Sequence, residues 1–242
     1  MHWTPRREKF RVILAGDTCV NPASVFDAMS ARVAENLGFE AGVLVGSIAS
    51  MTVLAGSDYL VLTVTELAEQ AYRINRAGNL LLLVDADHGY GNALNVKRTV
   101  EELETAGVAG RTAAVRINGV ADAITRAKAY EKAGVDAMFF AGITNKNDMG
   151  AIASEVKISI YLGSTVPEIN DLPYLSRQGV RIALQGHAPI HAAVQAVHDT
   201  LKALRDGTQP ADITNVVTGD LKEQILRGGD HKQWLKNFLA SG

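Results

Sequence analysis

Two carboxylates that directly follow an apolar segment, Asp85 and Asp87, have the clearest chemical potential in this sequence. The residues before them, 80–84, are all apolar and predict a buried strand. Because side chains alternate faces along a strand, both carboxylates lie on the face that carries Leu81 and Leu83. Buried carboxylates need a cation or hydrogen-bond donors, and hard oxygen ligands of this kind suit Mg²⁺ or Mn²⁺. We therefore expect a divalent metal site here.

Gly89 and Gly91 follow the carboxylates and favour the metal interpretation. Glycines allow a tight turn and let the backbone come close to a bound group. Asn92 then fits as the N-cap of a helix that continues to Ala106. The alternative is an aspartate that caps this turn beside a structural salt bridge, and in that case the two glycines have no evident use.

Composition narrows the class of protein. A chain of 242 residues, 47% of them hydrophobic, can form a sizeable α/β core. With a net charge of −2 and no basic run, we expect no nucleic-acid partner. No apolar run reaches the length of a membrane span, and residues 1–10 lack the apolar core of a signal peptide. The single cysteine, Cys19, suits a reducing cytoplasm and is a buried filler or, alternatively, a nucleophile.

Helical and strand patterns alternate along the chain, and the elements that they predict must position the two carboxylates. Residues 7–15 fit either a strand or a helix, and we favour a helix. Ser24 and Thr65 are the expected starts of two helices. The strands are expected at 18–23, 41–45, 80–84, 136–140, 158–162 and 180–184, and the helices at 25–37, 65–77, 92–106, 120–133, 147–155, 172–178, 189–205, 220–226 and 231–239. This alternation predicts a parallel sheet with helical crossovers in a single domain, 1–242.

The alternation breaks after Gly107. A strand, a loop, a helix and another strand are expected there, but Val108 to Gly110 runs straight into Arg111. A barrel of eight βα units takes about 30 residues per unit and about 250 in total. At most seven strands can be placed in this chain, six of them at the ranges given above. Either the sheet closes differently, or one βα unit is absent around residues 109–111.

Several motifs, taken in their order along the chain, resemble the isocitrate lyase and phosphoenolpyruvate mutase superfamily. They are SVFDAMSA at 24–31, Gly46-Ser47, Asp58, DADHGYGNALNV at 85–96, Arg111-Thr112 and GVRIALQGH at 179–187. The run D-x-D-x-G-Y-G-N is the most specific of these. The motifs ASVFDAMSAR and GNALNV, together with a Gly-His pair after the last strand, most resemble those of the oxaloacetate decarboxylase branch.

The resemblance implies a fold, an assembly and a reaction. The fold would be a (β/α)8 TIM-type barrel with extra C-terminal helices. Superfamily members are usually homotetramers in which the last barrel helix is exchanged between neighbours. The reaction would be the decarboxylation of oxaloacetate, a small 2-oxo acid, to pyruvate and CO₂ through an enolate that Mg²⁺ or Mn²⁺ stabilises. The alternatives are a methylisocitrate-type lyase, a phosphonate mutase and a catalytically silent barrel that binds a metal or a 2-oxo acid.

The resemblance also assigns roles to residues. Asp85 would bind the metal directly, and Asp87 and Asp58 would hold waters bound to it. Gly46 and Ser47 would bind the substrate carboxylate through backbone N–H groups and the hydroxyl. For Asp58, a plain turn residue is the alternative.

Arg111 and His187 are the expected catalytic and substrate-binding side chains. Arg111 suits a bidentate contact with a carboxylate, although a surface salt bridge is the alternative. His187 lies at the mouth of the barrel, where it could donate to the substrate or carry a proton, or it could simply be packed or solvated. Its spacing to His191 could suggest zinc, but Pro189 starts a helix between them, so the two need not share a face.

The sequence departs from the superfamily at one place. The fourth strand of the family carries an I-E-D motif whose glutamate also serves the metal, and a mobile catalytic loop follows it. Both are absent here, at the point where the alternation breaks.

Overall fold

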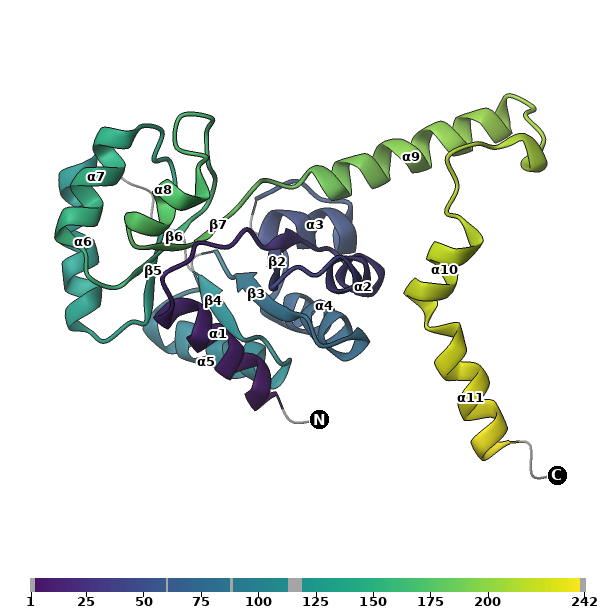
Figure 1. The fold of residues 1–242 in the computed structure, drawn as a ribbon, viewed down its shortest axis with the longest axis horizontal. Coiled ribbons are helices and arrows are strands. Elements are labelled where there is room, and N and C mark those ends of the chain that lie inside the picture. The colour runs from purple at the N-terminus through teal and green to yellow at the C-terminus, as the bar shows by residue number, and fades with distance from the viewer. Residues whose placement is uncertain (1–2, 60, 88, 113–118, 240–242) are drawn as a thin grey trace. The chain divides into compact units, whose positions relative to one another are not determined.

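The computed structural model describes residues 3–59, 61–87, 89–112 and 119–239. The chain divides into two compact units, 1–187 and 188–242. All the strands among these residues belong to the first unit and form two parallel sheets (Figure 1). The prediction of a single domain over 1–242 stays a prediction.

The first sheet contains four parallel strands in the order β1-β2-β3-β4. They are β1 (Ala23–Ser24), β2 (Ala41–Val45), β3 (Leu81–Asp85) and β4 (Gly110–Thr112). The helices that follow them are α2 (Ala28–Asn36), α3 (Gly46–Leu54), α4 (Val64–Ala77) and α5 (Ala93–Thr105). The apolar residues at 80–84 are all buried, as expected for a strand covered on both faces.

The second sheet contains three parallel strands in the order β5-β6-β7. They are β5 (Ala137–Phe140), β6 (Ser159–Leu162) and β7 (Val180–Ala183), and their helices are α6 (Val120–Lys132), α7 (Lys146–Glu155) and α8 (Leu172–Arg177). Helices follow strands in both sheets, which confirms the predicted βα alternation (Figure 1).

Alternate residues of the strands belong to different layers. Leu82 and Val84 of β3 pack with α2, α4 and α5, whereas Met138 and Phe140 of β5 pack with α6, α7 and α8. The buried residues between them lie on the opposite, inner faces, because side chains alternate along a strand. They are Val43, Val45, Leu81, Leu83, Phe139 and Tyr161.

The two sheets are joined on one side. Val20 pairs with Ile182 of β7, and β1 begins shortly afterwards and pairs with β2. On the other side, β4 pairs with β3 and β5 pairs with β6, but no pairing between β4 and β5 occurs within the described residues. This is the place where the sequence pattern breaks. Closure into a barrel is therefore an expectation that the observed sheets support only in part.

Residues 7–15, which fitted either a strand or a helix, are helical and belong to α1 (Thr4–Ala15). This helix contacts both sheets. Arg6 is buried and donates to Asn75 Oδ1 at 2.8 Å and to the Asn75 carbonyl oxygen at 2.7 Å. Arg7 pairs with Glu104 at 2.8 Å. At the other end of α1, Ser159 Oγ of β6 donates to the Leu14 carbonyl oxygen at 2.8 Å.

Two predicted helix starts are wrong, and one helix was missed. Ser24 lies in β1, and α2 starts instead after Asp27, whose Oδ1 accepts from the Ser30 N–H at 2.7 Å. Thr63, rather than Thr65, caps α4. Helix α3 directly follows β2 and was not expected, because its residues are apolar or small on every side and show no polar face.

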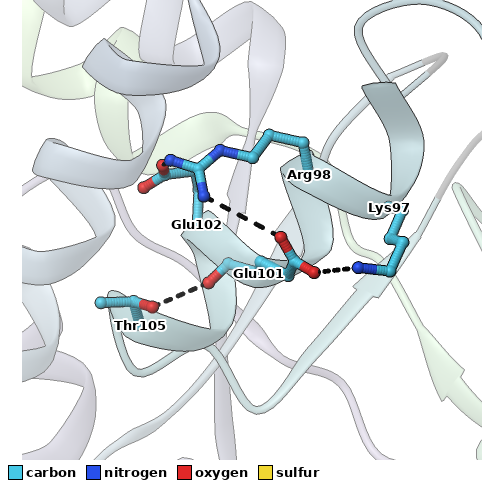
Figure 2. A network of polar contacts seen from close by, with 5 residues as sticks. All are labelled: Lys97, Arg98, Glu101, Glu102 and Thr105. Carbon is cyan, nitrogen blue, oxygen red and sulfur yellow. Dashed lines mark hydrogen bonds and ion pairs between the residues drawn. The ribbon is translucent and has the colours of Figure 1, made fainter. Parts of the chain in front are cut away.

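The surface of α5 carries a network of ion pairs (Figure 2). Lys97 pairs with Glu101 and Arg98 pairs with Glu102, one helical turn apart, while Thr105 donates to the Glu101 carbonyl oxygen at 2.8 Å. The hydrogen bond from Lys97 lowers the pKa of Glu101. These exposed pairs are screened by solvent and support the helix only weakly.

The second unit is entirely helical within the described residues. It contains α9 (Ala188–Arg205), the short 3-10 helix η1 (Pro210–Asp212), α10 (Gly219–Leu226) and α11 (Gly228–Phe238). Many of its large apolar side chains are exposed, among them Val197 and Leu201 of α9 and Phe238 of α11. None of the helices in the described part of the chain is long and apolar enough to cross a bilayer.

Candidate active site

The two carboxylates that the sequence singled out lie together at the carboxyl end of β3. Asp85 is the last residue of β3 and is in register with Val45, the last residue of β2. Asp87 adopts a left-handed backbone conformation with φ of 50°, which is uncommon for a residue other than glycine. Its N–H donates to Asp85 Oδ1 at 3.1 Å. The left-handed turn brings the Asp87 carboxylate back over the sheet edge.

Gly46 provides the space that the Asp87 carboxylate occupies. A Cβ atom built on Gly46 would lie 2.2 Å from Asp87 Oδ2, closer than real contacts allow. Gly46 is also the first residue of α3, and Ser47 is half-buried beside it. The N–H groups in the first turn of a helix lack intrahelical partners and favour anions. The predicted carboxylate-binding pair thus lies at a helix N-terminus next to Asp87.

Three carboxylates influence one another electrostatically at this edge. The pKa of Asp87 is raised to about 6, firstly by burial and then by the negative charges of Asp85 and Asp58. Asp58 itself lies on an exposed bend between α3 and α4. The structure therefore places Asp85 and Asp58 close enough to Asp87 for their charges to raise its pKa. Within the described residues, however, no group of three or more His, Cys, Asp or Glu side chains is arranged closely enough to hold a metal ion.

Two tyrosines near these carboxylates were missed by sequence reasoning. Tyr161 of β6 is buried, with its ring edge-on to Phe139 at a centroid distance of 5.0 Å. Burial, and then the charge of Asp85, raise the pKa of Tyr161. Burial raises the pKa of Tyr90 to about 12, with further contributions led by Asp87. Because Tyr161 and Asp85 belong to different sheets, their coupling indicates that the inner faces of the two sheets share one interior. A periodic apolar pattern gives no signal for such a contact.

His187 lies just beyond β7, at the carboxyl edge of the second sheet. Its Nδ1 is 2.9 Å from Oγ of Ser24, the last residue of β1. Sequence reasoning identified His187 but assigned Ser24 to a helix cap, because a contact across 163 residues leaves no local pattern. His191 belongs to α9, in the second unit.

Arg111 lies in β4, in register with Val84 of β3. Its side chain is outside the part of the structure that is described, so its expected contact with a carboxylate stays a prediction. Thr112, the next residue, is in register with Asp85.

Cys19 is buried next to the second sheet. Its N–H donates to Ser176 Oγ at 2.8 Å, and burial raises the pKa of the thiol to about 12. A thiol with this pKa is protonated near neutral pH and is a poor nucleophile. These observations favour the buried-filler interpretation.

A cavity of about 420 Å³ lies elsewhere, between the starts of β4 and β5 and beside α1. Its lining includes Phe10, Gly110, Asp136 and Tyr161, and it contains none of the predicted site residues. The cavity lies beside the starts of β4 and β5, between which the described residues show no pairing. None of the three carboxylates lines it, although Tyr161, which is coupled to Asp85, does.

Comparisons with known proteins agree with the motifs. The profile of the phosphoenolpyruvate phosphomutase family matches in two segments, residues 10–113 and 111–205. An oxaloacetate decarboxylase from Bradyrhizobium sp. (strain ORS 278) is 45% identical over 98% of each chain. Among solved structures, oxaloacetate acetylhydrolase has a TM-score of 0.82 at 22% identity, with 98% of each chain covered. Phosphonopyruvate hydrolase in complex with oxalate and Mg²⁺ has a TM-score of 0.81 at 20% identity, covering 97% of this chain and 99% of that one.

The same comparisons locate a difference in length. The alignment with the Bradyrhizobium protein runs over 282 positions although this chain has 242 residues, so at least 40 positions have no residue here. The two segments of the family profile meet at residues 111–113, in and directly after β4. The break in the sequence pattern, the missing pairing and the meeting point of the two profile segments thus coincide. With matches over most of its length, the chain belongs to the phosphoenolpyruvate phosphomutase family, within the isocitrate lyase and PEP mutase superfamily, and is an enzyme of the carbon–carbon lyase class.

Proposed function

We propose that this enzyme decarboxylates oxaloacetate to pyruvate and CO₂ with the help of Mg²⁺ or Mn²⁺. The observation that carries the proposal is the carboxylate cluster at the end of β3, where burial and two like charges raise the pKa of Asp87 to about 6. The 45% identity to a protein named oxaloacetate decarboxylase supports the choice of substrate. A small 2-oxo acid also fits a site that pairs carboxylates with a helix N-terminus.

The residues of the cluster fit a hard divalent cation. Asp85, Asp87 and Asp58 offer oxygen atoms only, which Mg²⁺ and Mn²⁺ prefer. Their mutual repulsion raises the pKa of Asp87, and a cation would relieve it. We propose that Asp85 binds the metal directly and that Asp87 and Asp58 bind it through water. When bound, the metal supplies Lewis-acid stabilisation of the charge that develops on the substrate.

The chain's own residues would bind and orient the substrate. The first N–H groups of α3, at Gly46 and Ser47, and the Ser47 hydroxyl would hold one carboxylate. Arg111 would pair with a carboxylate as a bidentate donor. Loss of CO₂ leaves an electron pair on the adjacent carbon, which takes up one proton to give the methyl group of pyruvate. His187 would carry that proton.

The test measures pyruvate from oxaloacetate with the purified full chain and Mg²⁺ or Mn²⁺. We expect a rate above that of the metal alone, and a fall to the metal-only rate in Asp85→Asn. Asp212→Asn, an exposed aspartate of η1, is the matched control and should keep the wild-type rate. Binding of oxalate and metal without turnover would contradict the proposal and would indicate a silent barrel that lacks part of its site.

We further propose a barrel fold, a homotetrameric assembly and a cytoplasmic location for this enzyme. The seven strands would form a (β/α)8-type barrel from which one βα unit is missing at β4. The apolar side chains of α9, including Val197 and Leu201 with exposed fractions of 59% and 61%, would be buried on a second copy in a helix-swapped homotetramer. Light scattering of Leu201→Glu, with Gln195→Glu as control, tests the assembly. The single, buried Cys19 is compatible with a cytoplasmic enzyme.

A further inference from the structure

We propose that Ser24 is a positioning residue that holds the ring of His187 in one orientation. The inference rests on the proposed role of His187 as the proton carrier. It concerns a residue that the sequence pattern assigned to a helix cap, and it follows from where Ser24 lies in the first sheet.

Ser24 faces the interior between the two sheets. Its neighbours Ala23 and Val25 both pack in the outer cluster with the helices, so the side chain between them lies on the opposite face. Ser24 is in register with Val43, which is in turn in register with Leu83. Because Asp85 follows Leu83 on the same face of β3, Ser24 and Asp85 face the same interior. Only 9% of Ser24 is exposed.

The hydrogen bond between Ser24 and His187 lies within a set of contacts that fixes the ends of β1 and β7 together. The Val20 N–H donates to the Arg181 carbonyl oxygen at 2.9 Å, and the Ala183 N–H donates to the Val20 carbonyl oxygen at 3.0 Å. Asn21 Nδ2 donates to the Ala183 carbonyl oxygen at 2.7 Å. These bonds join the segment just before Ser24 to β7, the strand just before His187, and so bring the two side chains close enough for the 2.9 Å contact.

The contact matters because the two nitrogens of an imidazole are not equivalent. The Ser24 hydroxyl either donates to a bare Nδ1 or accepts from Nδ1–H, and in both cases it restricts rotation of the ring. With Nδ1 engaged by Ser24, Nε2 is the nitrogen that would exchange a proton with the substrate. Without the Ser24 hydroxyl, other ring rotamers of His187 become populated, and a smaller fraction of the enzyme has the productive ring orientation.

The test combines a spectroscopic readout with kinetics on the full chain. In Ser24→Ala, we expect the ¹⁵N chemical shift of His187 Nδ1 to change, because this nitrogen loses its hydrogen bond to the Ser24 hydroxyl. We expect kcat to fall about 3-fold to 10-fold, the range of one hydrogen bond, while KM for oxaloacetate changes less than about 2-fold. Ser24→Thr keeps the hydroxyl and should restore both the ¹⁵N shifts and kcat.

Asn21→Ala is the matched control, because it removes another side-chain hydrogen bond between β1 and β7 without touching His187. It should lower the melting temperature and leave the His187 signals unchanged. Unaltered His187 signals in Ser24→Ala would overturn the proposal, whether or not the enzyme is active. Altered signals with an unchanged kcat would uphold the hydrogen bond and overturn the catalytic role of His187. The two failures can thus be told apart.

Discussion

At the scale of single residues, the absence of a side chain at position 46 is as important as the carboxylates around it. In Gly46→Ala, the new Cβ would lie 2.2 Å from Asp87 Oδ2, so the carboxylate must move. We expect at least a 10-fold loss of Mn²⁺ affinity, which can be measured by electron paramagnetic resonance, because misplaced ligands bind weakly.

Gly150→Ala is the control for this variant. Gly150 lies within α7, and a Cβ there would meet no atom within 4 Å. This change should leave Mn²⁺ affinity intact and stabilise the helix by up to about 1 kcal/mol. Equal Mn²⁺ affinities in the two variants would show that Asp87 is not part of the metal site.

The raised pKa of Asp87 predicts a pH-dependent stability of the metal-free protein. In the unfolded chain this carboxyl has a pKa near 4, whereas in the folded chain it is about 6. Between these values the carboxyl ionises first in the unfolded state, so the contribution of Asp87 to the free energy of unfolding falls as the pH rises from about 4 to about 6.

Asp87→Asn removes this penalty. With a chelator present at pH 8, we expect the variant to be more stable than the wild type by about 1 kcal/mol, after allowance for solvent screening of a half-buried group. At pH 4 the two proteins should be equally stable. Urea unfolding at both pH values measures the difference, and Asp212→Asn should show none.

The site residues differ in how visible they are to sequence reasoning. Asp85 and Asp87 could be predicted as site residues because both lie at the end of one strand and in the turn that follows it. Ser24 could not, since Asp27 makes the helix cap that Ser24 was expected to make, and the partner of Ser24 is His187, far along the chain. Contacts between distant elements depend on how the two sheets come together, which no local pattern encodes.

At the scale of secondary-structure elements, buried strands and well-capped helices were predictable. The strand at 41–45 and the helix capped by Asn92 agree with expectation, because continuous apolar runs and an N-cap are local signals. Helix α3 was missed since it lacks a polar face. The region of helix α1 was ambiguous because its apolar residues fit the spacing of a strand as well as that of a helix.

Arg6 provides a test of how α1 is held. In Arg6→Ala, the Asn75 side chain and the carbonyl oxygens of Asn75 and Gly78 lose a charged donor. We expect a loss of about 2–3 kcal/mol in the free energy of unfolding, since buried acceptors are left unsatisfied. Arg11→Ala, on the exposed side of α1, should cost less than about 0.5 kcal/mol in the same denaturation experiment. Similar losses in both variants would argue against Arg6 as the anchor.

At the scale of the whole molecule, the break near β4 predicts that the chain is under-packed. The relative from Bradyrhizobium has residues at 40 or more alignment positions that this chain lacks. Inserting those residues at 110–112 should supply a strand between β4 and β5, fill the 420 Å³ cavity and raise the melting temperature. We also expect the rate of oxaloacetate decarboxylation to rise by at least 10-fold.

A scrambled insert of the same length controls for loop length alone and should lower the melting temperature. If the native and scrambled inserts have the same effect, the cavity is not the place of a missing strand.

The seven-strand count and the break could be predicted from the sequence, because both follow from the spacing of the βα units along the chain. The cavity could not, since its lining comes from α1, β3, β4, β5 and β6 together.

The contacts of α1 also determine the order in which this protein can be completed during synthesis. Helix α1 leaves the ribosome before its partners, since Asn75, Glu104 and Ser159 follow Arg6, Arg7 and Leu14 by 69, 97 and 145 residues. A nascent chain that has emerged as far as β4 already holds the whole first sheet and the first two of these partners. Helix α1 is therefore held at both ends only after β6 has emerged.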